Sequence, residues 1–66
     1  MIIISGKELA IARAKKGLTI TELAIKAGVH RYTISRIEKG MLTPRLDTVG
    51  KIAKALDKPV EYFLEK

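Results

Sequence analysis

Cysteine and tryptophan are absent from this sequence of 66 residues, which has only one histidine, one phenylalanine and two tyrosines. Without cysteine there can be no disulfide and no thiolate metal site, and one histidine cannot supply a set of metal ligands alone. So few aromatic side chains also argue against a platform on which the bases of a single strand would stack. Apolar packing must therefore hold the fold together, and no metal or other cofactor is expected.

Long hydrophobic runs are absent as well. No apolar stretch approaches the roughly 18 residues needed to span a bilayer, and the run from Ile2 to Ile4 lacks the charged start and the length of a signal peptide. We therefore expect a cytoplasmic protein with no membrane partner. Because small chains bury only about 60% of the surface that their unfolded form exposes, one domain over residues 1–66 is the most we expect.

Positive charge is present in excess. Thirteen Lys and Arg residues against seven Asp and Glu give a net charge of +6 and a sequence pI of about 9.9. This pI exceeds the value of about 9 that is typical of nucleic-acid-binding domains. Basic chains also bind membranes and acidic proteins, so charge alone does not decide. Together with the few aromatic residues, it favours duplex DNA as the partner.

Helix start and stop signals predict an extended arm over residues 1–5 and then short helices. Ser5 is a candidate N-cap for a helix over residues 6–16, which Gly17 ends. Thr19 and Glu22 have the spacing of a capping box that opens a helix over residues 20–27, and Gly28 closes it.

Three further helices are predicted. One spans residues 31–39 and ends at Gly40, and the next begins at Thr43 as its cap, with Pro44 in the first helical position. Apolar residues recur at helical spacing along this fourth helix: Leu46, Val49, Ile52, Ala53 and Leu56. Pro59 starts a last short helix with Val60, Phe63 and Leu64 inward. The predicted fold class is all-α, with five helices.

The segment from about residue 20 to 39 has the pattern of a helix-turn-helix. Ala24 is small where two helices must cross closely, and Gly28 tolerates the positive φ that a tight turn requires. Ile34 and Ile37 then attach the second helix to the body of the domain. The pattern predicts that this second helix presents a polar face outward.

The sequence resembles the Cro and phage-repressor family of helix-turn-helix domains from about residue 7 to 64. The resemblance is carried by "LTITELAIKAGVHRYTISRIEKG" followed by "TPRLDTVGKIAKALDKPVEYFL". It implies a five-helix, lambda-repressor-like domain that binds operator DNA as a two-fold symmetric dimer and catalyses no reaction. We therefore expect a sequence-specific transcriptional regulator, and in particular a repressor that binds an inverted repeat as a homodimer.

Base reading is implied for four residues on the helix over residues 31–39: Arg31, Tyr32, Thr33 and Arg36. They lie on the face opposite Ile34 and Ile37. Arginine can bond guanine O6 and N7, and Thr33 can hydrogen-bond a base edge or meet a thymine methyl. Tyr32 can equally contact sugar or phosphate. The alternative is a solvated basic face without a role in recognition.

A second set of residues matches positions where the family meets the DNA backbone or the minor groove: Thr19, His30, Lys39, Gly40, Thr43 and Arg45. Thr19 opens a helix whose free amides attract phosphate. His30 stands where a capping Ser or Thr is usual, and we expect a poor cap at the surface there rather than a phosphate contact. Lys39 and Arg45 could equally be solvated charges.

Two structural roles are also implied by the resemblance. Arg13 and Glu38 match an ion pair between the first and third helices, although they could also be unrelated surface charges. Such a pair would orient the reading helix rather than simply add stability. The dimer contact is expected after the fourth helix, at Lys58, Pro59, Val60, Glu61 and Tyr62.

Three isoleucines depart from the family pattern. Ile20 stands where a glutamine often contacts phosphate, so that contact should be absent, and Ile11 and Ile25 fall at positions that are usually polar. Single exposed isoleucines are common. If these residues gather with the arm from Ile2 to Ile4, they could form a patch for a regulatory protein. The alternative function is therefore a protein-interaction module on the same fold, such as an antitoxin or a cofactor that bridges to polymerase.

Overall fold

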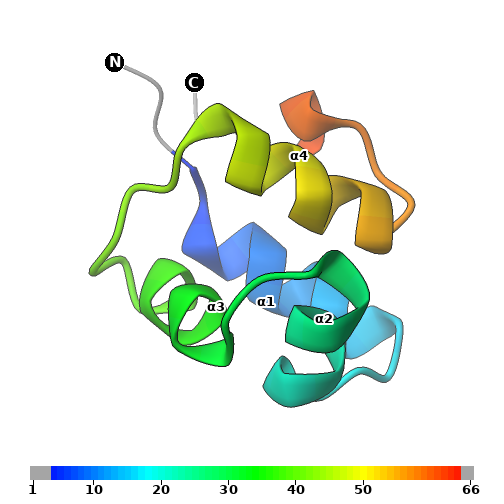
Figure 1. Ribbon diagram of the computed structural model, residues 1–66. Helices are drawn as coiled ribbons and strands as arrows, with labels where there is room; N and C mark the ends of the chain where they lie inside the picture. The colour runs from blue at the N-terminus through cyan, green and yellow to red at the C-terminus, as the bar shows by residue number, and fades with distance from the viewer. Residues whose placement is uncertain (1–3, 65–66) are drawn as a thin grey trace.

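The computed structural model describes residues 4–64 and consists of short helices joined by loops, as Figure 1 shows. Its elements are α1 (Gly6–Lys15), α2 (Ile20–Ala27), α3 (Arg31–Glu38), α4 (Leu46–Ala55) and a short 3₁₀ helix, η1 (Val60–Phe63). Helix α2 packs against both α3 and α4, and α1 packs against α3 and η1. Within residues 4–64 the only β pairing is an isolated bridge between Ile4 and Leu64. The all-α class is confirmed.

Local signals set the first two helices. The Ser5 hydroxyl accepts a hydrogen bond from the Glu8 amide at 3.2 Å, so Ser5 caps α1. At α2, the Thr19 hydroxyl accepts from the Glu22 amide at 3.0 Å and the Glu22 carboxylate accepts from the Thr19 amide at 2.8 Å. These two bonds complete a capping box. Gly28 ends α2 with a φ of 73°, the left-handed conformation that the turn requires.

The prediction of five α-helices is wrong, because the last one is a single 3₁₀ turn, Val60–Phe63. Asp57 adopts a left-handed φ of 57° just before this segment, and Leu64 pairs with Ile4 just after it. Pro59 has no amide hydrogen to continue a helix from α4. The few residues between these fixed points leave room only for the tighter turn, in which the Tyr62 amide donates to the Pro59 carbonyl at 3.0 Å.

The predicted start of α4 is also wrong. Neither Thr43 nor Pro44 begins the helix, which starts at Leu46 after Arg45, and Arg45 makes no side-chain cap. Instead Pro44 is half-buried and packs beside Ile37 and Val49. Pro44 therefore lies before the helix. A proline also disfavours the helical conformation in the residue that precedes it, here Thr43.

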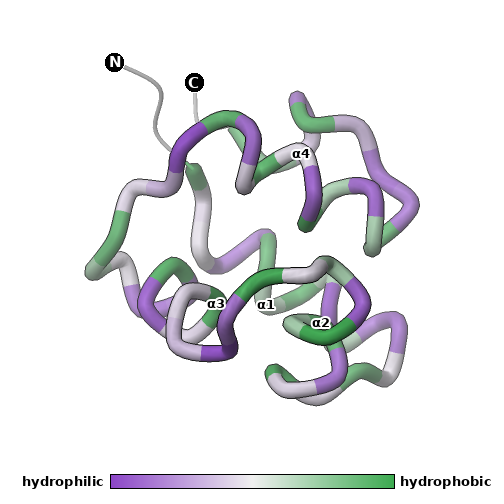
Figure 2. The backbone as a smooth tube through the Cα atoms, in the orientation of Figure 1, coloured by the Kyte–Doolittle hydropathy of each residue, from purple (hydrophilic) through white to green (hydrophobic). Residues whose placement is uncertain are grey.

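The core lies between α4 and the three helices that face it. Figure 2 shows hydrophobic and hydrophilic stretches alternating along the helices, as expected when one face of each is buried. The largest fully buried side chains of the core are those of Leu9, Leu23, Ile34, Ile37, Leu56 and Phe63. None of the helices within residues 4–64 has both the length and the apolar character that a membrane span requires.

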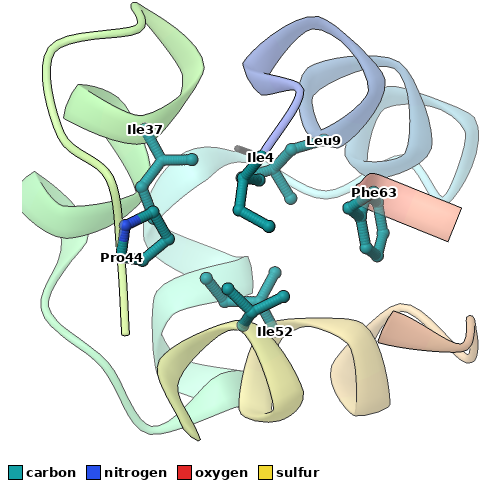
Figure 3. Close-up of a pocket in the computed structure, with 7 residues that line it drawn as sticks. Ile4, Leu9, Ile37, Pro44, Ile52 and Phe63 are labelled. Carbon is teal, nitrogen blue, oxygen red and sulfur yellow. The ribbon is translucent and has the colours of Figure 1, made fainter. Parts of the chain in front are cut away.

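A small gap remains inside the core, as Figure 3 shows. It has a volume of about 10 Å³ and an entirely apolar lining: Ile4, Leu9, Ile37, Pro44, Val49, Ile52 and Phe63. Ile4, from the predicted arm, therefore packs against the core, whereas Ile2 and Ile3 lie outside the described residues. A space of this size without polar partners is a packing gap rather than a ligand site.

Gly6 allows the first turn of α1 to approach the end of α3 closely. A Cβ atom at this position would overlap the Ile37 carbonyl oxygen and press on the backbone of Glu38. The sequence signals did not identify this role, because it depends on how two helices distant in the sequence meet. Gly6 therefore helps to fix α3 relative to α1.

Candidate nucleic-acid interface

Helix α3 has one buried face and one exposed face. Ile34 and Ile37 are buried in the core, whereas Arg31, Tyr32 and Arg36 are exposed and Thr33 is half-buried. The four residues predicted to read bases therefore lie outside the core-facing stripe of this eight-residue helix, near its start and one turn later. Such a helix can present several side chains together to a DNA groove.

His30 organises the exposed start of α3. Its Nδ1 accepts a hydrogen bond from the Tyr32 amide at 3.1 Å, so His30 caps the helix and the expectation of a poor cap is wrong. The His30 and Tyr32 rings stack with centroids 5.0 Å apart, and the Arg31 guanidinium lies 5.3 Å from the Tyr32 ring centroid. These contacts restrict where the Tyr32 ring can lie.

An ion pair holds the other end of α3. Arg13 Nε and Nη2 donate to the two oxygens of Glu38 at 2.7 and 3.0 Å, and Arg13 Nη1 donates to the Leu18 carbonyl at 2.8 Å. The hydrogen bond from Arg13 to Glu38 raises the pKa of the arginine, although burial opposes this rise. Because both side chains are mostly buried, the fork-shaped contact fixes α3 to α1 in one orientation.

The start of α2 has amides available for an anion. Within residues 4–64, the capping box uses the amides of Thr19 and Glu22, and no hydrogen bond uses those of Ile20 and Thr21. The bond from the Thr19 amide lowers the pKa of Glu22, because it stabilises the negative charge of the carboxylate. A phosphate at this end of α2 would meet the two free amides of Ile20 and Thr21. The Glu22 carboxylate, which accepts from the Thr19 amide, lies close by.

The loop after α3 carries the remaining residues that were predicted to meet the DNA backbone. Lys39 and Thr43 are exposed, and Gly40 turns the chain with a φ of 74°. Arg45 Nη2 donates to Asp47 Oδ2 at 3.1 Å, and both side chains are largely exposed. Arg45 therefore keeps most of its donors accessible.

Sequence reasoning missed three exposed apolar side chains in and just after this loop: Met41, Leu42 and Leu46. Leu46 was assigned to the buried face of the fourth helix, but it is 53% exposed because the helix begins only at this residue. Met41 and Leu42 lie in the irregular segment between helices, where no periodic pattern could indicate exposure.

The segment that was predicted to form a dimer contact is partly committed to the core. Val60 is half-buried and packs against the core, whereas Lys58, Pro59, Glu61 and Tyr62 are exposed. The Lys58 ammonium lies 4.8 Å from the Tyr62 ring centroid, so these two side chains support one another at the surface. The loop before this segment is tied to α1 by an ion pair between Lys16 and Asp57, which lowers the pKa of Asp57.

The isoleucines that depart from the family pattern do not all share one environment. Ile4 packs against the core, as does part of Ile20, whereas Ile25 is 76% exposed on α2 and Ile11 is 36% exposed on α1. Ile4 and Ile20 are thus partly buried, and a patch that joins these isoleucines with the arm stays a prediction, because Ile2 and Ile3 lie outside the described residues.

An open concavity of about 240 Å³ lies between the start of α2 and the exposed face of α3. We call it the α2–α3 groove, and its lining residues are Ile20, Thr21, Arg31, Tyr32 and Ser35. The sequence indicated Arg31 and Tyr32 as functional but gave no role to Thr21 or Ser35. Their contribution depends on how α2 and α3 meet across the turn at Gly28.

Comparison with known proteins places this arrangement in a family. The sequence pattern of the helix-turn-helix family matches residues 9–63, which include α2, α3 and the turn between them. The chain belongs to the Cro/C1-type helix-turn-helix family. Members of this family similar to the chain are transcriptional regulators rather than enzymes.

Three relatives show the extent of the similarity. An uncharacterised regulator of Archaeoglobus fulgidus is 47% identical over 49 residues, which are 74% of this chain and 70% of that protein. The repressor RghR of Bacillus subtilis is 39% identical over 62 residues, 92% of this chain and 46% of RghR. A crystal structure of SinR in complex with DNA superposes with a TM-score of 0.82 at 33% identity, covering 85% of this chain and 90% of that one.

The similarity extends over only part of the length of several relatives. The chain spans about half the length of the Bacillus subtilis regulators that it matches. SinR, from the same organism, has also been solved as a complex with the protein SinI.

Proposed function

We propose that this chain is the DNA-binding module of a sequence-specific transcriptional regulator and that α3 reads the major groove of duplex DNA. The observation that carries the proposal is the exposed face of α3, with Arg31, Tyr32 and Arg36 directed away from a buried and anchored face. The net charge of +6 supports a polyanionic partner. The relative SinR, solved with DNA, supports the same reading. Such a role places the protein with DNA in the cytoplasm.

The first test is selection of bound sites from random duplexes at a stated salt concentration, followed by alanine variants of the reading residues. Arg31→Ala or Arg36→Ala should lower affinity for the selected site by about 1–3 kcal/mol and relax the preference at a definable base pair. Lys54→Ala is the matched control, because it removes a positive charge from an exposed position on α4. Equal losses on selected and random DNA would reassign the arginines to phosphate contacts.

The residues outside α3 are proposed to hold the DNA backbone. Lys39→Ala and Arg45→Ala should weaken binding to selected and random DNA alike, because phosphates carry no sequence information. Each loss should also reduce the slope of log affinity against log salt concentration by about one unit. An unchanged slope would remove that residue from the interface. We propose backbone contacts for Thr19, Gly40 and Thr43 in the same sense, and a minor contribution at most for His30.

We propose that the regulator is a repressor that binds an inverted repeat as a homodimer, with half-sites about 34 Å apart. A single α3 presents only four candidate reading residues, and doubling them by symmetry would supply the specificity that one module lacks. The repressor name of the relative RghR supports the direction of regulation. A promoter reporter that carries the selected site should fall when the protein is expressed.

The proposed dimer contact is the exposed part of the segment from Lys58 to Tyr62. Sedimentation with the selected duplex should show two protomers per duplex, and Tyr62→Glu should return the complex to one protomer, because a charge would enter an isologous contact. Selected sites without two-fold symmetry would rule the dimer out. Symmetric binding that survives Tyr62→Glu would move the contact elsewhere on the chain.

A regulatory protein is the second candidate partner. The observation that favours it is the exposed apolar surface of Met41, Leu42 and Leu46, together with the existence of a complex of the relative SinR with SinI. If selection from random duplexes enriches no sequence, a protein-interaction module such as an antitoxin or a polymerase-bridging cofactor becomes the better function for the chain.

A further inference from the structure

The α2–α3 groove opens beside the face of α3 that is proposed to read DNA. Arg31 and Tyr32 belong both to that face and to the lining of the groove. Ile20 and Thr21, the first two residues of α2, contribute the rest of its lining together with Ser35 of α3. A base pair that meets Arg31 would therefore have Ile20 and Tyr32 close to its neighbour.

The lining combines hydrogen-bonding groups with an apolar wall. Thr21 and Ser35 contribute hydroxyl groups and Arg31 a guanidinium, whereas Ile20 can neither donate nor accept a hydrogen bond. Part of Ile20 packs against the core, and the remainder borders the groove. That remainder is exposed apolar surface, which gains free energy when another apolar group covers it.

Among the groups that base pairs display in the major groove, the apolar one is the C5 methyl of a pyrimidine, which thymine carries in ordinary DNA. Resting on the proposed reading of DNA by α3, we propose that the α2–α3 groove takes this methyl group and that Ile20 makes the chain specific for a thymine. The thymine lies in the base pair next to the one that Arg31 contacts, because both side chains line one concavity.

Tyr32 prepares the groove for this contact. Its ring stacks on His30 at a centroid distance of 5.0 Å and lies 5.3 Å from the Arg31 guanidinium. These two contacts favour one position of the ring before any ligand arrives, which lowers the side-chain entropy that binding costs. The groove is therefore suited to distinguish a methyl group from a hydrogen atom.

The test replaces each thymine of the selected duplex by deoxyuridine, which removes the methyl and leaves the hydrogen-bonding edge unchanged. We expect one position per half-site at which uracil weakens binding roughly four-fold, the effect of leaving one methyl group uncovered. This position should adjoin the base pair whose preference relaxes in Arg31→Ala. A parallel selection from a library that carries 5-methylcytosine asks whether that base, which has the same methyl group, is enriched there instead.

Variants at two isoleucines assign the effect. In Ile20→Ala the ratio of affinities for thymine and uracil should fall close to one, and in Ile20→Val most of the ratio should remain. Ile25→Ala makes the same change on α2 outside the groove and should keep the full ratio. Each ratio compares two duplexes with the same protein, so a smaller folded fraction cancels.

Two outcomes would overturn the inference: a wild-type chain that is insensitive to every uracil, or a thymine preference that persists in Ile20→Ala. Both can occur while site-specific binding and the effect of Arg31→Ala remain, in which case the proposed function stands without the methyl contact. Enrichment of 5-methylcytosine instead of thymine would keep the groove's ligand chemistry and overturn the assigned base. Failure to enrich any sequence would overturn both proposals.

Discussion

The two ends of α3 are held by different kinds of contact. At the carboxyl end, Ile37 is buried, Glu38 is bonded twice to Arg13, and the backbone closely approaches Gly6 of α1. At the amino end, the side-chain hydrogen bond is a local one, the cap by exposed His30. The contacts that tie α3 to α1 therefore lie at the end away from Arg31 and Tyr32, and these two side chains remain exposed to a ligand.

The largest expected effect comes from filling the space at Gly6. Alanine normally stabilises a helix relative to glycine. In Gly6→Ala, however, the new methyl would overlap the Ile37 carbonyl. We expect a loss of about 2–3 kcal/mol in the free energy of unfolding, measured by chemical denaturation, because α1 and α3 must separate. Gly50→Ala in α4 is the matched control, since a Cβ there meets no atom within 4 Å.

The control is informative because its change in the free energy of unfolding should have the opposite sign. Gly50→Ala should stabilise the protein by about 0.5–1 kcal/mol, the ordinary gain from replacing glycine in a helix. If both substitutions stabilise, α1 does not constrain the end of α3, and the difference between the two ends is smaller than we argue.

The next effect concerns the buried ion pair. Glu38→Ala should cost about 2 kcal/mol, because it leaves the mostly buried Arg13 without its partner, and the Arg13→Ala, Glu38→Ala double variant should lose less than the sum of the single variants. Thermal or chemical denaturation measures all three. The exposed pair of Arg45 and Asp47 gives the control, and Arg45→Ala should change stability by at most about 0.5 kcal/mol.

Strict additivity of the two single variants would show that Arg13 and Glu38 do not stabilise each other in solution. A coupled loss of stability should be accompanied by a loss of sequence preference in DNA binding, since α3 would no longer be held in one orientation.

The smallest effect is expected at the amino end of α3. His30→Ala removes the side chain that accepts from the Tyr32 amide and should cost about 0.5–1 kcal/mol, the usual contribution of a helix cap. His30→Ser should recover the stability, because serine is a good cap. Amide hydrogen exchange should become faster at Tyr32 in the alanine variant and stay slow at Ile37.

A loss in His30→Ala as large as that in Glu38→Ala would contradict the comparison. It would mean that the exposed cap, and not the ion pair, holds the helix in place.

The sequence predicted those features that depend on neighbouring residues. Ser5 and the pair of Thr19 and Glu22 act within one helical turn, so their caps could be predicted and are present. The start of α4 could not be predicted, because Pro44 is drawn into the core by Ile37 and Val49. The role of Gly6 was equally hidden, since it depends on the distant carbonyls of α3.

The candidate site likewise has some features that the sequence pattern predicts and others that depend on how the helices pack. The outward face of α3 follows from the spacing of Ile34 and Ile37, and the structure places Arg31 and Arg36 away from them. The α2–α3 groove does not follow from any pattern, because it arises where Ile20 and Tyr32 approach across the turn. A residue that had been judged to lose a contact, Ile20, thus lines the concavity beside the reading face.

The bridge between Ile4 and Leu64 brings the two ends of the described chain together, which would allow the helices to be joined in a different order. The Ser5 amide donates to the Phe63 carbonyl at 2.8 Å, so the first and last described segments are already neighbours. A short linker between them would close the backbone into a ring without moving a helix, and the ring could be opened at the exposed turn of Gly17. In such a circular permutant, α2 would become the first helix and α1 the last, while the packing around α3 would remain the same.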